Sequence, residues 1–462
     1  MENTKKIDWY TLAFMAFSTV WGFGNVLNGF VYFNGVQVIF SWVLMFALYF
    51  VPYALMVGEL GSAFKQSGGG VSSWIHETIG PKCAYYAGWT YWACHVTYIA
   101  SKGSGGLKAL SWMFFQNGTT YDQFPTIWIQ LATLAALLFF CWVASRGLNP
   151  LKKLATIAGT SMFVMSILYI LMMFAAPAIN PNGGYVTMEF SKETLIPQFN
   201  LGYFTSLSIL VFAVGGCEKI SPYVNKVKDP SRGFPKGMIA LAIMVMVCAI
   251  LGTIAMGMMF DPAVINESSE SFNSYVSNGA YWSFQKLGEY YHVGNLLLII
   301  YAACNAIGQF STLVLSIDAP LRMLLDNEDA RQFVPTKLLK KNQHGAYING
   351  IFMVAGLSGS IILIQSFVPG AAAVLTQLNK LNSVTMPLRY LWVFVAYIAL
   401  RKAADKFHPE YRFVKNQGIA LTAGIWCFVV TASTALNVIT PFVLTALGLI
   451  LPIIKKNEKT AG

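Results

Sequence analysis

Two charged side chains, Glu218 and Lys219, interrupt an otherwise apolar stretch that runs ILVFAVGGCEKISPY from Ile209. Two glycines, Gly215 and Gly216, precede them in the same stretch. A glycine costs a helix about 1 kcal/mol relative to alanine, and a carboxylate at the centre of a bilayer costs roughly 3 kcal/mol or more. A sequence tolerates both costs where the segment lines a polar cavity, so we expect a binding site here.

Glu218 is the candidate for proton coupling. A carboxyl group shielded from water ionises less readily and can exchange protons near neutral pH. The alternative is a structural carboxylate, hydrogen-bonded permanently to neighbouring backbone, that holds a broken helix open. We expect Lys219 to lean away from the cavity, either pairing with Glu218 or extending toward water.

Lys102 and Arg389 are two further cations inside apolar segments, and neither is expected to face lipid. They either hold a side-chain carboxylate of a ligand or serve as internal counter-ions for Glu218, and for Arg389 the counter-ion role is favoured. Tyr98 lies one helical turn before Lys102 and is a candidate pocket residue. His95 is more often a packing residue in such a setting.

A second interruption lies near the N-terminus, where Gly22 and Gly24 divide the apolar segment FSTVWGFGNVLNGF that begins at Phe17. The two interrupted segments are the first and the sixth apolar spans, so they enter the membrane in opposite directions. Paired glycine-broken segments in inverted halves indicate the central binding site of a transporter. Close packing of helices through small residues is the alternative, but two pairs in register favour a binding site.

Unwound backbone at the two interruptions can bind both ends of a zwitterion. A helix that restarts after the first break presents free N–H groups and a partial positive charge to a carboxylate. A helix that ends at the second break presents free carbonyl groups to an ammonium. The predicted substrate-binding residues are Trp21, Gly22, Phe23, Gly24, Phe212, Ala213, Val214 and Gly215, together with Tyr98 and Lys102.

The composition requires a membrane to hold these segments. The chain has 462 residues, of which 56% are hydrophobic and 11% charged, whereas soluble domains carry about 25% charged residues. A membrane span needs about 20 apolar residues. We predict an all-α polytopic membrane protein with twelve transmembrane helices, at about 10–33, 38–63, 83–112, 126–144, 151–177, 201–224, 236–260, 281–320, 347–367, 371–401, 417–437 and 439–454. The third, eighth and tenth of these are longer than one bilayer crossing, so we expect tilt, breaks or helical extensions there.

The basic residues gather at one side of this predicted membrane domain. The net charge of +11 comes from Lys and Arg before the first span and after every even-numbered span, while the other loops carry few, Lys192 being the clearest exception. This alternation follows the positive-inside rule with both termini cytoplasmic, in a multi-pass protein of the cell membrane. It makes nucleic acid an unlikely partner, and the lipid bilayer an obligatory one.

Other classes of protein have little support in the sequence. The seven cysteines form no C-x-x-C pair, so we expect no metal site and no cofactor. H-E-x-x-H, G-x-S-x-G and Walker motifs are absent from the sequence, which disfavours a membrane-embedded enzyme. A channel is disfavoured because no repeated selectivity-filter-like segment occurs.

The segment Phe212–Gly237, FAVGGCEKISPYVNKVKDPSRGFPKG, carries a resemblance to a known family, as do Glu59-Leu60, Ser67–Val71 and Trp74 in the second span. On these motifs the chain resembles the amino acid–polyamine–organocation permeases, in particular their bacterial glutamate/GABA-antiporter-like branch. One departure is in the first span, where Trp21–Asn25 stands in place of a Gly-Ser-Gly-like core.

The resemblance implies a single transporter domain over 1–462 with a LeuT-like 5+5 inverted repeat. The repeats would cover about 9–177 and 201–401, with broken helices 1 and 6, and additional helices would lie at about 417–454. It also implies a secondary active transporter, an antiporter or proton-coupled permease, for an amino acid or its decarboxylated amine, with Glu218 at the proton-sensing position. A sodium-coupled amino acid symporter is the alternative, because a hydroxyl pair, Ser311-Thr312, lies in span eight.

Overall fold

The helical architecture expected from the sequence is confirmed in the described part of the chain. The computed structural model describes residues 6–327, 330–367, 386–407, 409–433 and 447–460. Every regular element within these ranges is a helix. Extended segments pair there only in two isolated bridges, Ile7 with Val227 in parallel and Lys341 with Tyr347 in antiparallel orientation.

Seven helical segments of the described residues are long and apolar enough to cross a membrane. They are Gly35–Ala63, which joins η1 (Gly35–Gln37), α3 (Val38–Met45), the π-helical η2 (Phe46–Phe50) and α4 (Val51–Ala63); α8 (Thr126–Ser145); α9 (Leu148–Ile179); Ser206–Lys226, which joins α11 (Leu201–Val214) to the 3₁₀ helix η3 (Cys217–Lys226); α12 (Pro230–Gly257); α15 (Leu296–Leu325); and α17 (Ile348–Phe367).

The other helices include α1 and α21, which are shorter apolar helices, and the long, more polar α6. Their bounds are α1 (Trp9–Val20), α2 (Gly24–Tyr32), α5 (Val71–Thr78), α6 (Pro81–Phe115), α7 (Thr120–Gln123), α10 (Lys192–Leu195), α13 (Pro262–Ile265), α14 (Ser269–Tyr290), α16 (Ala330–Phe333), η4 (Thr336–Leu339), η5 (Met386–Tyr390), α19 (Leu391–Lys402), α20 (Ala404–Phe407), α21 (Gln417–Ser433) and α23 (Ile450–Thr460).

The two predicted backbone breaks are confirmed, since α1 gives way to α2 over residues 21–23 and α11 gives way to η3 over residues 215–216. Within the predicted span at 281–320 two helices, α14 and α15, meet, so a break is the one of the expected outcomes that this long span takes. His292 and Gly294 between them have left-handed backbone, with φ of 53° and 58°, which a continuing helix cannot contain. The total of twelve spans stays a prediction, because parts of the spans at 371–401, 417–437 and 439–454 lie outside the described residues.

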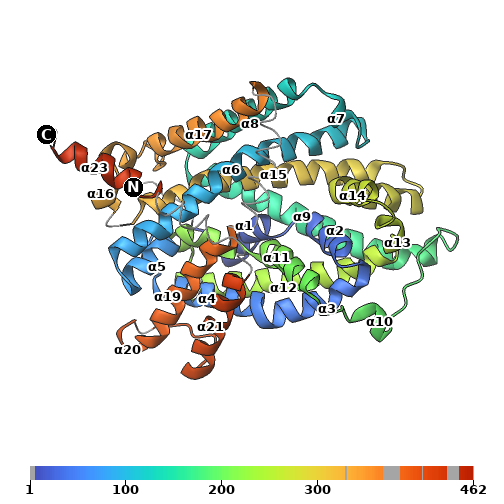
Figure 1. Ribbon diagram of the computed structural model, residues 1–462, viewed down its shortest axis with the longest axis horizontal. Coiled ribbons are helices and arrows are strands. Elements are labelled where there is room, and N and C mark those ends of the chain that lie inside the picture. The colour runs from blue at the N-terminus through green and yellow to red at the C-terminus, as the bar shows by residue number, and fades with distance from the viewer. Residues whose placement is uncertain (1–5, 328–329, 368–385, 408, 434–446, 461–462) are drawn as a thin grey trace.

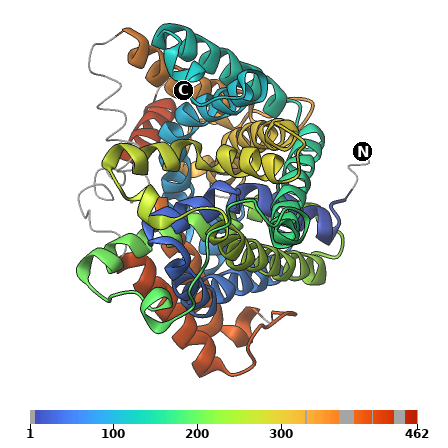
Figure 2. The ribbon, with the colours of Figure 1, turned by 90° about the vertical axis from the view of Figure 1, so that its right-hand side faces the viewer.

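The helices are arranged around a central group that contains both breaks. Figure 1 shows α8 and α17 along one side of the molecule and α19, α20 and α21 along the other, with α1, α11 and α12 between them, and the view turned by 90° in Figure 2 keeps this order. Among the long helices, α6 packs along α15, α4 against α12 and α8 against α17. At the ends of the long axis, α10, α13 and α14 lie opposite α5, α16 and α23 (Figure 1).

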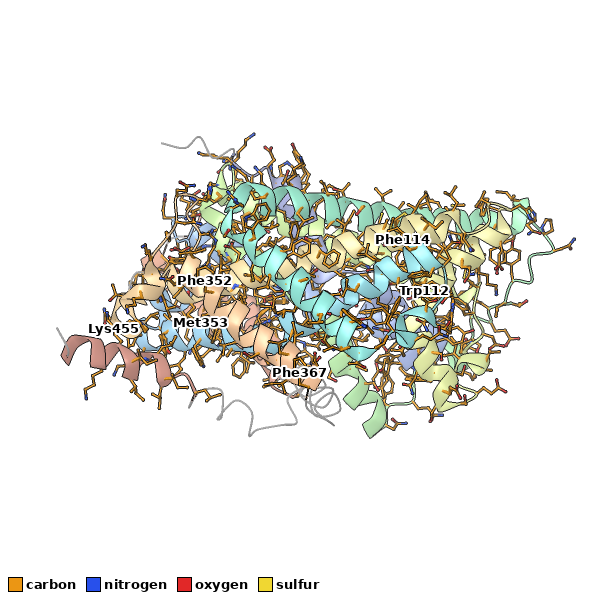
Figure 3. The ribbon with its side chains drawn as sticks, turned by 90° about the horizontal axis from the view of Figure 1, so that it is seen from above. Trp112, Phe114, Phe352, Met353, Phe367 and Lys455 are labelled. Atoms are coloured by element: carbon orange, nitrogen blue, oxygen red, sulfur yellow. The ribbon has the colours of Figure 1, made fainter. Side chains whose placement is uncertain are left out.

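The outer face of the bundle is apolar where a water-soluble protein would be polar. Figure 3 shows α17 crossing this face, with Phe352 near its start and Phe367 at its end. These two side chains and Phe114 of α6 are 66%, 69% and 66% exposed. Apolar surface of this extent needs a non-aqueous surrounding, and helices satisfy their own backbone hydrogen bonds in lipid. The fold is therefore that of an integral membrane protein.

Candidate functional site

The first break is an abrupt change of backbone direction after Val20. Trp21 is extended, with φ −124° and ψ 134°, and α2 restarts at Gly24. The first turn of the new helix is closed by two hydrogen bonds between residues three positions apart, from Asn25 N to Gly22 O (2.9 Å) and from Val26 N to Phe23 O (3.0 Å). The N-terminus of α2 thus begins in the interior of the molecule.

The second break depends on two glycines for different reasons. Gly216 has φ 108°, a left-handed value that residues with a Cβ rarely adopt. Gly215 is extended, and a Cβ on it would lie 2.3 Å from the Tyr390 hydroxyl, so only glycine allows η5 to approach so closely. After these glycines η3 continues as a 3₁₀ helix for ten residues, far longer than the usual three or four.

Asn25 connects the two breaks. Its Nδ2 donates to Ala213 O (3.2 Å) at the end of α11 and lies 3.4 Å from Val20 O at the end of α1. The Thr19 hydroxyl lies 3.5 Å from Gly216 O, although its stronger bond is to Ala16 O at 2.8 Å. One amide side chain therefore bonds to the last turns of both interrupted helices.

A cavity of about 440 Å³ lies between the two breaks. It extends along α6 from Tyr98 to Lys108 and reaches Asn28 of α2 and Val276 of α14. The predicted residues in its wall are Trp21, Gly22, Gly24, Tyr98, Lys102, Phe212, Ala213, Gly215 and Arg389. Three others lie outside the wall: Val214 is fully buried, Phe23 packs edge-on against Tyr169 and Phe284, and Glu218 lies behind Arg389.

Every charged side chain among the described residues of this wall is a cation. They are Lys102, Lys108, Lys219 and Arg389. Because neighbouring charges of one sign raise the free energy of an empty cavity with low-dielectric walls, such a wall favours an anionic ligand. The sequence singled out Lys102 and Arg389 but placed Lys219 away from the cavity and did not consider Lys108.

The Tyr98 ring lies between two of these ammonium groups. Lys102 Nζ lies 4.9 Å and Lys219 Nζ 5.5 Å from the ring centroid. Each lysine also donates one hydrogen bond across to α15, Lys102 to Gln309 Oε1 (3.1 Å) and Lys219 to Ser316 Oγ (2.6 Å). Single neutral acceptors and an aromatic face leave both cations able to bind an anion.

Arg389 joins the cavity to a buried polar cluster. Its Nη2 donates to the Tyr390 hydroxyl (3.4 Å), and its Nη1 lies 3.2 Å from His95 Nε2. His95 Nδ1 lies 2.6 Å from Tyr91 O, and because a carbonyl only accepts, Nδ1 carries the proton and Nε2 accepts from Arg389. The imidazole is therefore neutral and positions the guanidinium, more than the packing role expected for His95.

Glu218 is fully buried and faces away from the cavity. The Tyr53 hydroxyl of α4 donates to its Oε2, and its Oε1 lies 3.7 Å from Arg389 Nε. Neither of these last two atoms has a hydrogen-bond partner among the described residues. The ion pair is loose, which leaves the guanidinium able to bind a second carboxylate from the cavity side.

The hydroxyl pair of span eight lies beside the first break. Thr312 Oγ1 donates to Ser18 O of α1 (3.0 Å) and lies 2.9 Å from Gly308 O, while Ser311 Oγ is buried without a hydrogen-bond partner in the described part of the chain. Ser316, which accepts a hydrogen bond from Lys219, lies one helical turn after Thr312 in α15. Among the described residues, no group of three or more His, Cys, Asp or Glu side chains could hold a metal ion.

Several wall residues were missed by the sequence analysis. Asn25 directly follows Gly24, so the glycine pair that predicts the first break also marks its position. The polar side chains of α15 give a weak signal only, because isolated amides are common in membrane helices. The missed residues are Asn25, Lys108, Lys219, Asn305, Gln309 and Tyr390.

Comparisons with known proteins give a family and several relatives. A family model described as amino acid permease matches residues 7–454. The aspartate/glutamate permease AcaP of Lactococcus lactis subsp. cremoris is 45% identical, over 99% of this chain and 97% of that protein. The inner membrane transporter YjeM of Salmonella typhimurium is 24% identical over 96% and 91%. A glutamate/gamma-aminobutyrate antiporter of Lactococcus lactis subsp. lactis is 23% identical over 84% and 75%.

Proposed function

Because the chain belongs to the amino acid permease family, a family of transporters and not of enzymes, we propose that it carries an acidic amino acid, aspartate or glutamate, through the central cavity. The observation that carries this proposal is the all-cationic charge of the described cavity wall. The relative at 45% identity, described as an aspartate/glutamate permease, supports the same class of substrate.

The two breaks orient the backbone of the substrate in this proposal. The α-carboxylate binds the amides of Gly22 and Gly24 at the start of α2, where the helix dipole is positive. The α-ammonium binds carbonyl groups at the end of α11, near Ala213. The side-chain carboxylate then binds Lys219, which has a single neutral acceptor, and Arg389, whose ion pair with Glu218 is loose.

A decarboxylated amine fits this cavity less well than an acidic amino acid. Agmatine or putrescine would add positive charge beside four cations at short range, which costs free energy in a low-dielectric site. A molecule with two carboxylates and one ammonium lowers the charge of the cavity by one. We therefore place free amines last among the substrates of the family.

We further propose the architecture and orientation that the sequence suggested. Corresponding helices of the two halves contact each other in four pairs: α1 with η3, α4 with α12, α6 with α15 and α8 with α17, an arrangement that agrees with a two-fold axis in the membrane plane. This supports the inverted repeats at about 9–177 and 201–401 in one domain. The end that carries α5, α16 and α23 faces the cytoplasm, on the charge distribution of the loops.

Transport by exchange or with a proton fits Glu218, whose carboxyl is buried behind Arg389 and joined to Tyr53. Loading a carboxylate onto Arg389 weakens its hold on Glu218, and protonation of Glu218 frees Arg389 for the substrate. The two events are thermodynamically linked, since each favours the other.

A sodium-coupled symporter is the second candidate, favoured by the Thr312 hydroxyl on Ser18 O and the unpartnered Ser311 hydroxyl. The Lys219 ammonium one turn away opposes it, because a fixed cation repels a free one. Replacement of external sodium by choline tests this candidate. We expect uptake to be unchanged, and its loss would establish sodium coupling.

Counterflow into proteoliposomes tests the proposed substrate. Vesicles loaded with unlabelled glutamate should accumulate labelled glutamate and aspartate, and neither labelled putrescine nor alanine. Exchange identifies a carrier, whereas passive current without exchange would identify a channel. Counterflow of amines alone would overturn the assignment of an acidic substrate.

A further inference from the structure

A second cavity, of about 650 Å³, lies at the other end of the same broken segment. Lys219 of η3 is in the wall of the central cavity, and Pro222, Tyr223, Asn225 and Lys226 of η3 are in the wall of the second one. Along α15, Thr312 and Arg322 belong to the two walls, ten residues or about 15 Å apart. η3 therefore separates two cavities that lie one behind the other.

The wall of the second cavity has an excess of positive charge, because only two of its cations, Arg322 and Lys341, have carboxylate partners among the described residues. Asp326 accepts from Arg322 Nη1 (3.5 Å) and Lys341 Nζ (2.6 Å), and Arg322 Nε also donates to Asp318 (2.7 Å). Two carboxylates thus balance two cations in this network.

Arg146 and Lys226 remain in the wall with exposed side chains and with no ion pair to any described residue. The Arg146 guanidinium lies 4.7 Å from the Trp142 ring centroid. Asn225 Oδ1 is a buried acceptor of the same wall, without a hydrogen-bond partner in the described part of the chain. Two free cations and one free acceptor are therefore available to a ligand.

The wall that faces these groups is rigid. Asn342 Nδ2 donates to Ser145 O (2.7 Å), and its Oδ1 accepts from His344 N (2.9 Å) and Ala346 N (3.1 Å). Gly147 has φ 83°, and a Cβ on it would lie 2.4 Å from His344 O. The loop at 341–346 is thus fixed on the end of α8, and the cavity is formed before a ligand binds.

We propose that the second cavity is a separate binding site for the same class of ligand as the central one, a small dicarboxylate bearing an ammonium group. Its carboxylates bind Arg146 and Lys226, and its ammonium binds Asn225 Oδ1. This inference rests on the proposed function. The site holds an acidic amino acid at the end of the molecule opposite α14, next to η3, which separates the two cavities.

Equilibrium binding of labelled glutamate to the full-length protein, in nanodiscs of phosphatidylcholine, tests the site. We expect two molecules bound per wild-type chain and one per R146Q/K226Q chain. Each single variant should weaken the second site by about tenfold or more, the value of one charge-assisted hydrogen bond. R389Q should lose the glutamate bound in the central cavity and keep the one bound in the second cavity. K153Q/K236Q, which removes two exposed lysines of the same end outside both cavities, should keep two.

The outcomes separate this inference from the proposed function. Absence of any glutamate binding to the wild type would overturn both. One bound molecule in the wild type, unchanged in R146Q/K226Q, would overturn the second site alone. Displacement of only the second molecule by inorganic phosphate at equal concentration, or by phosphatidylglycerol added to the nanodisc, would assign the cavity to phosphate or to a lipid headgroup instead.

Discussion

Among the cations of the cavity wall, Arg389 contacts the largest number of buried polar and aromatic side chains in the described part of the chain. It bonds to His95 and Tyr390, faces Glu218, and its guanidinium lies 5.3 Å from the Tyr91 ring centroid. Arg389→Gln should weaken glutamate binding by about ten- to a hundredfold, since a hydrogen bond to a charged group is worth about 1.5–3 kcal/mol. Arg389→Lys should restore little, because an ammonium cannot make these planar contacts together.

Scintillation-based binding measures this effect, with Lys402→Gln as the matched control for loss of a cation at an exposed position. Equal affinities of Arg389→Gln and the control would show that the side-chain carboxylate binds elsewhere in the cavity.

Glu218 has one firm partner, the Tyr53 hydroxyl, which ties η3 to α4. Glu218→Gln keeps the size of the side chain and an oxygen for this bond but removes the proton exchange. We expect it to flatten the pH profile of uptake while glutamate binding persists. Uptake measured from mildly acidic to neutral pH, beside the exposed control Glu289→Gln, checks this. An unchanged profile would assign proton coupling to another group, and a protein that fails to fold would favour the structural role.

The second break provides a clean test of backbone conformation. A Cβ on Gly216 would meet only Thr19 O, at an ordinary 3.6 Å, so Gly216→Ala adds strain without a collision. A left-handed residue other than glycine costs roughly 1–2 kcal/mol, and thermal unfolding in detergent should show that loss. Gly216→Asn should cost less, because asparagine tolerates this region. Gly356→Ala, a glycine of α17 with open space around it, should be neutral or stabilising.

The start of α1 is fastened to the end of η3. Ile7 N donates to Lys226 O and Lys228 N to Ile7 O, both at 2.8 Å, and Asp8 pairs with Lys228 at 2.9 Å. The hydrogen bond from Lys228 lowers the pKa of Asp8. A lowered folded pKa contributes stability above the ordinary aspartate value, about 4, and this contribution is lost as the pH falls through the folded value.

Acidification below pH about 4 should therefore lower the protection of the Ile7 and Lys228 amides relative to their intrinsic exchange rates, and Asp8→Asn should show the lower protection already at neutral pH. Exchange measured by mass spectrometry tests this, with the exposed Asp405→Asn as control. Equal protection of Ile7 in Asp8→Asn and wild type would mean that the backbone bonds alone hold the segment.

The sequence allowed both breaks to be predicted because their cause is local: paired glycines and a charge within apolar stretches. It did not predict the direction of Lys219. In a 3₁₀ helix successive side chains are about 120° apart, and η3 keeps this winding for ten residues, so Glu218 faces Tyr53 while Lys219 faces the cavity. The contact of Arg389 with His95 joins residues 294 positions apart, and no local pattern encodes such a contact.

The length of the segment 281–320 indicated a tilt, a break or a helical extension, but the sequence pattern did not give the position of the break. Apolar residues continue from Leu296, and the polar stretch before it is short enough to fit inside a tilted span. The break itself comes at His292 and Gly294, which both have left-handed backbone, and the pattern of apolar residues does not mark this position. The exposed apolar faces of α8 and α17, in contrast, follow directly from their composition.

The bundle as a whole places its cavity cations within the electric field of the membrane, so the resting potential acts on them. The empty cavity holds four cations, and a bound acidic amino acid with a net charge of −1 lowers that charge. Each elementary charge that crosses 100 mV changes the free energy by about 2.3 kcal/mol, so even a quarter of a charge moved by the empty carrier alters its rate about threefold.

Net uptake and one-for-one exchange should therefore respond differently to voltage. Exchange uses only the loaded carrier in both directions, whereas net uptake includes the return of the empty, more positive one. In vesicles clamped by potassium and valinomycin, an imposed potential should change the rate of net glutamate uptake more than that of glutamate–glutamate exchange, because the loaded carrier holds one positive charge fewer. Equal responses would mean that the lysines and Arg389 stay fixed in the field. With unequal responses, the membrane potential sets how often an unloaded carrier returns, so a cell that loses its potential exchanges amino acids more readily than it accumulates them.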